Sequence, residues 1–336
     1  MLEYLPDDIV YNILDRIPKK YLLRFQCVSK PSHRLISDFI KSKSRRMILL
    51  PGKPFEVIDN NDTANLMVSP PRRIPENKHF RLIGSVNGTV LFVTVSHANM
   101  ILYNPFTGAA KKVPNLPPHH GSPCRCVYGF GYGTAPDDLK IVKIHVASNG
   151  CSSRYYCDVF RLKTRSWNTH SHLISDDMCF YHDEYNGVFV NGFMYWSGYN
   201  YIRRMILALD VKNMIFSEIK PCAPVSLLHP LGTFKGSLCV ICFQTSPKYE
   251  LWVMNEKSWS KVCSLTSLWK DNYIRTSLNM GMCILDEGKI VMLKDSNEVI
   301  LYDMLRDSYK KVKTVMKRRP GLQAVECIES CVSLSL

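Results

Sequence analysis

The sequence repeats one short pattern five times, at intervals of about 50 residues. In each copy an apolar residue ends a β-rich run, a turn segment follows, and a partner residue lies seven positions after the first. The five pairs are Tyr103 with Ala110, Phe160 with Trp167, Leu209 with Phe216, Trp252 with Trp259, and Tyr302 with Tyr309. This spacing predicts a β-hairpin in which the second residue, aromatic in all but the first copy, packs against the strand it returns to.

A repeat of this length constrains the fold of residues 46–336. Four strands in about 50 residues are what one blade of a kelch-type β-propeller needs. Residues 55–60 form a weaker copy of the pattern, and the length of the region predicts about six blades. The last apolar run, residues 324–334, is expected to pair with strands near residues 46–58, because closing the ring removes exposed sheet edges. The fold class is therefore mainly β.

A second element recurs between the hairpins and consists of a glycine turn amid β-branched and aromatic residues. Its copies include Asn87-Gly88, Asn191-Gly192 and Lys235-Gly236. Glycine and asparagine tolerate the positive φ angles of two-residue turns, so these segments predict the inner hairpins of the blades.

The first 45 residues follow a different, helical pattern. Ile9, Ile13, Leu14 and Ile17 recur at helical spacing until Pro18 ends the run, and two further apolar stretches follow. Some 35 residues are too few to bury that much apolar surface in one small core. We expect three short helices whose surplus apolar residues cover a partner.

The order of these N-terminal motifs closely resembles the F-box. The matching pieces are Leu5-Pro6, Ile13-Leu14, Ile17-Pro18, Leu22-Leu23-Arg24-Phe25, Cys27-Val28-Ser29-Lys30 and Leu35-Ile36-Ser37. The resemblance implies a three-helix module that binds the Skp-type adaptor of cullin-based SCF ubiquitin ligases. The adaptor-binding residues it implies are Leu5, Pro6, Ile9, Ile13, Leu14, Ile17, Pro18, Leu22, Leu23, Phe25 and Val28.

This chain departs from the F-box pattern at one position. Many F-boxes have a tryptophan where this chain has Ser32, which follows Pro31. The departure predicts a late start of the third helix and a weaker hold on the adaptor.

Residues 46–336 resemble the kelch-related F-box-associated domain of plants. The pieces that carry the resemblance include Tyr103-Asn104-Pro105, Tyr128-Gly129-Phe130-Gly131-Tyr132, Val190-Asn191-Gly192 and Glu250-Leu251-Trp252-Val253-Met254. Two domains are expected, an F-box at residues 1–45 and a substrate-recognition propeller at residues 46–336. The two resemblances imply a non-catalytic substrate receptor that links a target protein, through the adaptor, to the cullin and RING subunits for ubiquitination.

Composition limits the other readings. No apolar stretch approaches the roughly 18 residues that span a bilayer, and the acidic, proline-broken N-terminus is not a signal peptide. We therefore expect a cytoplasmic or nuclear protein without membrane contact, whose 13 cysteines are reduced. The net charge of +14 favours an acidic protein partner or plain solubility over nucleic acid.

Candidate chemistry is sparse. Cys239 and Cys242 have metal-like spacing, but a second pair is lacking and a β-strand would point them to opposite faces. The glycines of Gly129-Phe130-Gly131 do not complete a dinucleotide fingerprint, and easing a crowded inner strand explains them better. Turn acids such as Asp137 and Asp138 more often solvate turns than catalyse. No cofactor or metal is expected.

One segment is a candidate for the substrate-binding surface. Tyr199, Tyr201, Arg203 and Arg204 combine aromatic and arginine side chains, which are enriched at interface hot spots, although an ordinary aromatic strand explains them too. Three alternatives stay open. They are a stand-alone propeller that has lost the adaptor, a propeller enzyme with a helical cap, and a basic nucleic-acid-binding module.

Overall fold

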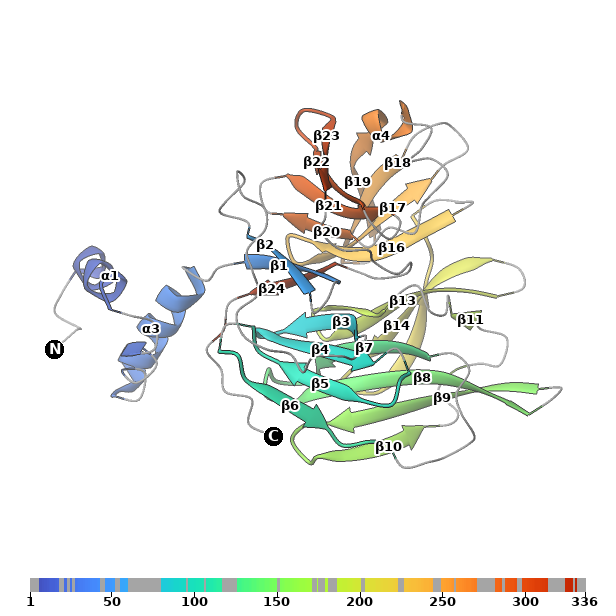
Figure 1. The fold of residues 1–336 in the computed structure, drawn as a ribbon, viewed down its shortest axis with the longest axis horizontal. Coiled ribbons are helices and arrows are strands. Elements are labelled where there is room, and N and C mark those ends of the chain that lie inside the picture. Colours follow the sequence, from blue (N-terminus) through green and yellow to red (C-terminus); the bar gives the residue numbers. More distant parts are fainter. Residues whose placement is uncertain are drawn as a thin grey trace.

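The computed structural model shows a mainly β protein with a small helical module at its N-terminal end (Figure 1). It describes residues 6–17, 21–22, 25, 28–42, 46–51, 55–59, 80–94, 96–105, 107–116, 126–149, 152–170, 174, 179–180, 186–200, 203–222, 227–243, 249–256, 258–270, 282–285, 288–294, 298–313, 324–328 and 330. The helices are α1 (Asp7–Asp15), α3 (Lys30–Ser42) and the short α4 (Thr266–Lys270). None of the helices in these ranges is long and apolar enough to cross a membrane.

Five antiparallel sheets of four or five strands form the blades, numbered here in chain order. The first blade has strands β3 (Phe80–Val86), β4 (Thr89–Thr94), β5 (Met100–Tyr103) and β6 (Ala110–Val113). The second has β7 (Cys126–Tyr132), β8 (Leu139–Asn149), β9 (Ser152–Arg161) and β10 (Ser166–His170). The third has β11 (Cys179–Phe180), β12 (Val188–Val190), β13 (Phe193–Tyr199), β14 (Arg204–Asp210) and β15 (Ile215–Ile219). The fourth has β16 (Leu227–Phe234), β17 (Ser237–Phe243), β18 (Tyr249–Asn255) and β19 (Ser258–Leu265). The fifth has β20 (Met282–Leu285), β21 (Lys289–Lys294), β22 (Glu298–Asp303) and β23 (Ser308–Lys313).

A sixth sheet, which we call the closing sheet, joins the two ends of the propeller. It contains only three strands among the described residues, namely β1 (Arg46–Pro51), β2 (Phe55–Asp59) and β24 (Val325–Ile328). β1 and β24 lie at the two ends of the propeller sequence and pair with each other, with Leu49 opposite Val325. Closure by the C-terminal strand is therefore confirmed.

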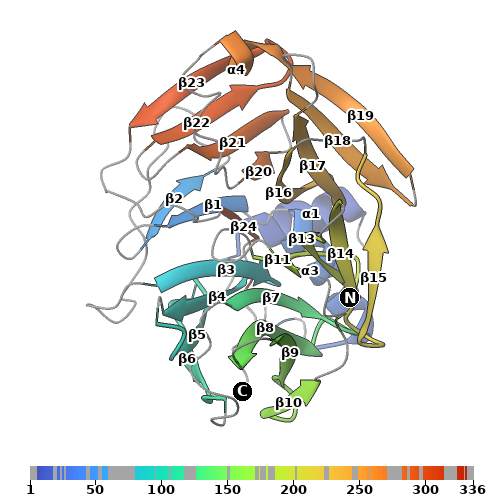
Figure 2. The ribbon, with the colours of Figure 1, turned by 90° about the vertical axis from the view of Figure 1, so that its right-hand side faces the viewer.

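The sheets follow one another in a closed ring (Figure 2). The inner strands contact in the order β24, β3, β7, β12 with β13, β16 and β20, and β20 returns to β24. The structure thus confirms a β-propeller, but it shows five blades and a three-stranded closing sheet, so six full blades are not confirmed.

The hydrophobic clusters lie between neighbouring sheets of this ring. One cluster joins the second and third blades, with Val142 and Ile144 packed in the same group as Trp196 and Leu207. The other clusters join successive sheets in the same way. Each blade alone has two apolar faces, so only the ring can bury them all.

The predicted hairpin pairing is confirmed in four of its five copies. Tyr103 lies opposite Ala110, Phe160 opposite Trp167, Leu209 opposite Phe216, and Tyr302 opposite Tyr309.

The predicted pairing is wrong for the copy at Trp252 and Trp259, because Trp259 lies opposite Met254 and not opposite Trp252. In that hairpin Asn255 faces Ser258, so the turn holds two residues, whereas Asp210 faces Ile215 across four. The shorter turn moves the register and gives Trp259 a different neighbour.

The predicted glycine turns are confirmed as inner hairpins. Asn87 and Gly88 have φ angles of 51° and 72°, and Asn191 and Gly192 have 48° and 84°. Positive φ at both central residues matches the right-handed twist of the flanking strands.

The glycines of β7 let the third blade approach closely. A Cβ atom added at Gly131 would lie 2.3 Å from the Phe189 ring, and one at Gly129 would lie 2.6 Å from the sulfur of Met194. Crowding, rather than phosphate binding, therefore explains why these two positions are glycine.

Polar contacts also join neighbouring blades. Lys140 of β8 donates from Nζ to the carbonyl oxygen of Val211 in the β14–β15 turn at 2.7 Å. Trp167 donates from Nε1 to the Pro114 carbonyl at 2.8 Å, and Trp259 to the Lys220 carbonyl at 2.9 Å. In both tryptophan contacts the outer strand of one blade binds the segment that leaves the outer strand of the preceding blade.

Several buried polar groups meet around Asp158 in the second blade. Asp158 of β9 accepts a hydrogen bond from the Thr169 hydroxyl at 2.7 Å, and His145 Nδ1 lies 3.1 Å from its other carboxylate oxygen. Burial raises the pKa of the Asp158 carboxyl. The contacts with Thr169 and His145, together with nearby Lys143, lower it by more, so the net pKa lies below its usual value.

Candidate functional site

The helical module has its own small core. Val10 and Leu14 of α1 pack with Ile36 and Phe39 of α3, and Leu22 fills the space between them. The ring of Tyr11 stacks on Phe39 with centroids 5.6 Å apart. The buried positions of α1 are one turn apart, which is the spacing of a single helix face.

A second apolar group on the same module is exposed. Val28 is 72% exposed and Phe25 47% exposed, and Ile9 and Ile13 of α1 are exposed to a similar degree as Phe25. Ile9 and Ile13 lie one turn apart and beside the buried face of the helix. Large apolar side chains left outside a filled core indicate a surface that another protein covers.

The structure divides the predicted adaptor-binding residues into two classes. Ile9, Ile13, Phe25 and Val28 are exposed, as is Pro6 immediately before α1. Leu14 and Leu22 are buried inside the module, and Ile17 packs partly against that core, so these three support the surface from within. Leu5, Pro18 and Leu23 lie outside the described residues.

Sequence reasoning assigned the core face of α1 incompletely. It grouped Ile9 and Ile13 with Leu14 and Ile17, and it missed Val10, which is 1% exposed. The series Val10, Leu14 and Ile17 has the i, i+4, i+7 spacing of one helix face and would have identified the buried residues.

The predicted late start of the third helix is wrong. Helix α3 begins at Lys30, and the Ser29 hydroxyl accepts a hydrogen bond from the Ser32 backbone N–H at 3.2 Å. This is the N-cap arrangement, and Pro31 fits it because the first turn has no use for its missing N–H. The three-helix form of the module is not confirmed, since most of residues 18–27 lie outside the described ranges.

The module joins the propeller at one particular face. β1 is antiparallel to β24, and Arg46 at its start lies opposite Ile328 at the end of β24. The Asn87-Gly88 turn lies at this same end, because a Cβ atom at Gly88 would meet Ser330. We call this end of the ring the linker face, and Figure 1 shows the helices beside it, with β11 at the opposite, distal face.

The predicted substrate loop lies at the distal face. Tyr199 ends β13 opposite Arg204 at the start of β14, and β11 pairs beside Tyr199. The turn between these strands is closed by the Asn200 side chain, which accepts from the Arg203 N–H at 2.8 Å. The Arg203 guanidinium donates to Glu218 of β15 at 2.7 Å. Tyr199 and Arg203 are exposed, Arg204 is half-buried, and Tyr201 lies outside the described residues.

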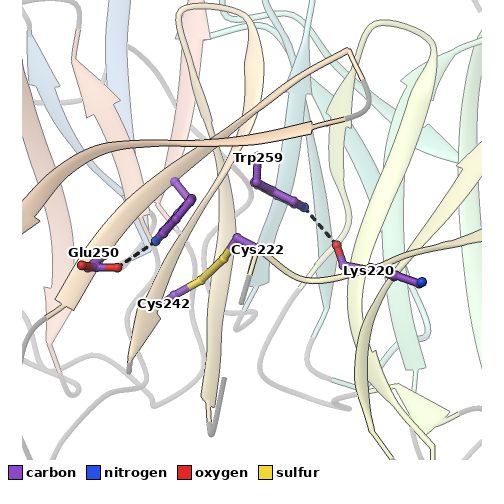
Figure 3. The surroundings of a disulfide bond; sticks show 6 residues. Lys220, Cys222, Cys242, Glu250 and Trp259 are labelled. Atoms are coloured by element: carbon purple, nitrogen blue, oxygen red, sulfur yellow. Dashed lines mark hydrogen bonds between the residues drawn. A yellow bond between two sulfur atoms is a disulfide. The ribbon is translucent and has the colours of Figure 1, made fainter. Parts of the chain in front are cut away.

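The structure gives the candidate metal ligands another arrangement. Cys239 and Cys242 point to opposite faces of β17, as predicted, because they belong to different hydrophobic clusters. Cys242 forms a disulfide with Cys222, so the expectation that all cysteines are reduced is wrong for this pair (Figure 3). Within the described ranges no three His, Cys, Asp or Glu side chains gather as a metal site.

The sequence comparisons match both parts of the chain. Residues 2–43 match the F-box domain, and residues 53–326 match the F-box associated beta propeller domain. F-box protein CPR1 of Arabidopsis thaliana is 27% identical over 98% of this chain and 89% of its own length. An F-box/kelch-repeat protein of the same plant is 22% identical over 89% of this chain and 87% of its own length.

Solved structures share the fold at low sequence identity. A chain of a nidogen/laminin complex superposes with a TM-score of 0.52 at 12% identity, over 86% of this chain and 100% of its own length. TolB from Acinetobacter baumannii gives a TM-score of 0.52 at 9% identity, over 88% of this chain and 72% of its own length. These likenesses concern the fold alone. The two domain matches cover most of the sequence, and the chain therefore belongs to the plant F-box proteins that carry an F-box associated β-propeller domain.

Proposed function

We propose that this protein is the substrate-recognition subunit of an SCF-type ubiquitin ligase. The helical module binds a Skp-type adaptor, through which the cullin and RING subunits join, and the propeller binds the protein to be ubiquitinated. The observation that carries the proposal is the exposed apolar group Ile9, Ile13, Phe25 and Val28 on a module whose own core is already filled. Ubiquitin transfer takes place on a separate enzyme, so this chain acts without a nucleophile of its own, in the cytoplasm or nucleus.

Burial of these side chains supplies the binding energy. Covering one large aliphatic or aromatic side chain contributes roughly 1.5–3 kcal/mol when the side chain was fully exposed before. Val28 and Phe25 are the most exposed of the group and gain most from a partner surface. Leu14 and Leu22 act indirectly, because they hold α1 in place from inside the core.

The distal face is the side of the propeller that is free to receive a substrate. The linker face carries the chain that leads to the helical module, so a target bound there would lie beside the adaptor. On the distal face we propose Tyr199, Tyr201, Arg203 and Arg204 as the substrate-binding loop. The arginines and the net charge of +14 favour an acidic surface on the substrate.

The adaptor interaction is tested by capture of purified adaptor on immobilised full-length chain. Ile13→Asp and Val28→Asp each place a charge in the proposed contact without touching the module core, and each should weaken binding at least tenfold. Asn12→Asp is the matched control, since it adds the same charge at an exposed neighbouring position of α1. Equal binding by all three variants would contradict the proposed surface.

The same assay separates the stand-alone alternative. If the unmodified chain captures no adaptor at micromolar concentration, the ligase role is refuted and the propeller is a binding protein without this adaptor. If the adaptor binds, proteins that need both Tyr199 and Arg203 for capture are substrate candidates.

A further inference from the structure

The Cys222–Cys242 disulfide joins two blades of the propeller. Cys222 follows the end of β15, where the chain crosses from the third blade to the fourth, and Cys242 lies in β17 of the fourth blade. The two residues are 20 positions apart in sequence, and their Cα atoms lie 7.8 Å apart. This separation is wider than the roughly 4.4–6.8 Å that is usual for a disulfide, so closing the bond draws the crossover toward β17. Among the cysteines whose side chains the structure describes, no other pair is bonded.

The surroundings of the bond show what it holds in place. Figure 3 shows Cys222 beside Trp259, whose indole N–H binds the Lys220 carbonyl. Cys222 packs partly buried in the cluster that includes Trp252, Met254 and Trp259 of the fourth blade. The crossover segment is thus fixed to the fourth blade by a covalent bond, by apolar contacts and by a hydrogen bond from Trp259.

The two sulfurs differ in accessibility. Cys242 is fully buried, with 0% exposure, whereas Cys222 is only half-buried at the surface of the crossover. An attacking thiolate therefore reaches the Cys222 sulfur first, because thiol–disulfide exchange requires direct approach to one sulfur atom.

Five of the other described cysteines are poor competitors for this exchange, whereas Cys179 is half-buried, as Cys222 is. Cys126, Cys157, Cys239 and Cys327 are buried. Burial raises the pKa of Cys327 to about 12. Cys263 is half-buried, as Cys222 is, and burial raises its pKa to about 11. Thiols with such pKa values are protonated at neutral pH, and protonated thiols do not attack disulfides.

We propose that Cys222 and Cys242 form a reversible redox tether that locks the crossover between the third and fourth blades. In the reducing direction a dithiol attacks the Cys222 sulfur, Cys242 leaves as a thiolate and takes up a proton, and a mixed disulfide forms at Cys222. The second thiol of the reductant then displaces Cys222, so two protein thiols and one oxidised dithiol result. In the oxidising direction glutathione disulfide accepts the two electrons and becomes two molecules of glutathione. This tether stands independently of the proposed ligase role.

Peptide mass spectrometry on the full chain tests the pairing. The chain is equilibrated with glutathione disulfide or with dithiothreitol, its free thiols are alkylated, and it is digested with trypsin. After oxidation we expect linked peptides that contain Cys222 and Cys242, and after reduction we expect alkylation at both. Cys263 should be equally alkylated in the two states. Absence of the linked peptides after oxidation, or pairing of Cys222 with a different cysteine, would overturn the proposal.

Thermal unfolding tests whether the bond stabilises the fold. A loop of about 20 residues closed by a disulfide predicts that reduction lowers the melting temperature of the unmodified chain by about 5 °C. Cys222→Ser should show no response to reductant, whereas Cys263→Ser, a control of similar exposure, should respond as the unmodified chain does. An equal response in Cys222→Ser and the unmodified chain would refute the tether, whatever the absolute stability of each variant.

Discussion

Replacing Lys140 by methionine tests how strongly a single polar contact joins two blades. Lys140 is 4% exposed, and its ammonium donates to the buried Val211 carbonyl of the next blade at 2.7 Å. The same ammonium lies 3.3 Å from Asp138, whose side chain is 30% exposed. Methionine keeps most of the apolar stem and removes only the charged donor, so packing between the blades is largely preserved.

The expected loss follows from these two contacts. A hydrogen bond to a charged group contributes about 1.5–3 kcal/mol, and the substitution leaves the buried Val211 carbonyl without this donor. The ion pair with Asp138 adds about 1 kcal/mol at most, because solvent screens the partly exposed carboxylate. We therefore expect Lys140→Met to lower the free energy of unfolding by about 2–4 kcal/mol.

Urea unfolding followed by tryptophan fluorescence measures this loss. Lys163→Met is the matched control, since Lys163 is exposed in the β9–β10 turn of the same blade and should change stability by less than about 0.5 kcal/mol. Combining Lys140→Met with Asp138→Asn in a double-mutant cycle separates the ion pair from the carbonyl contact. A loss for Lys140→Met no larger than that of the control would refute the reasoning.

Two further predictions concern the second blade and its neighbours. Gly131→Ala should lower the free energy of unfolding by about 1–3 kcal/mol, since the added methyl group meets the Phe189 ring. Gly84→Ala is the control and should cost less, because the nearest atom to its added Cβ would lie 3.8 Å away. Equal losses of the two variants in urea unfolding would contradict the crowding at Gly131. The folded-state pKa of Asp158 is lowered, so its stabilising contribution is present above the unfolded pKa of about 3.9 and disappears as the pH falls through the lower folded pKa. Thr169→Val should therefore be less stable than the unmodified chain at pH 7, and the gap should narrow below about pH 4. A gap that stays constant from pH 7 to pH 2.5 would contradict the role of this hydrogen bond.

Local features of this protein could be read from its sequence. The seven-residue pairs predicted four hairpins correctly, and the Asn-Gly dipeptides predicted inner turns with positive φ angles. Both signals depend on neighbours close along the chain, where side-chain alternation and turn chemistry decide the conformation. The predicted register of the β18–β19 hairpin was wrong because its turn at Glu256 holds only two residues. Residue spacing alone does not reveal turn length.

The candidate site was predicted in part for the same reason. The order of the N-terminal motifs indicated an adaptor-binding module, but which apolar residues face inward depended on how α1 packs on α3. Val10 became core and Ile13 remained exposed, although both are apolar and three positions apart. The helical pattern fixes spacing on one helix, whereas the orientation of that helix depends on its partner.

Periodic patterns in the chain were enough to predict a helical module followed by a repeated β-hairpin array that closes on its own end. Only the folded protein shows the three-stranded closing sheet, the contact of Lys140 with Val211, and the disulfide between Cys222 and Cys242. The physical reason is that contacts between blades join residues far apart in sequence. They depend on sheet twist and on the size of the ring, and neither property leaves a periodic signal in the chain.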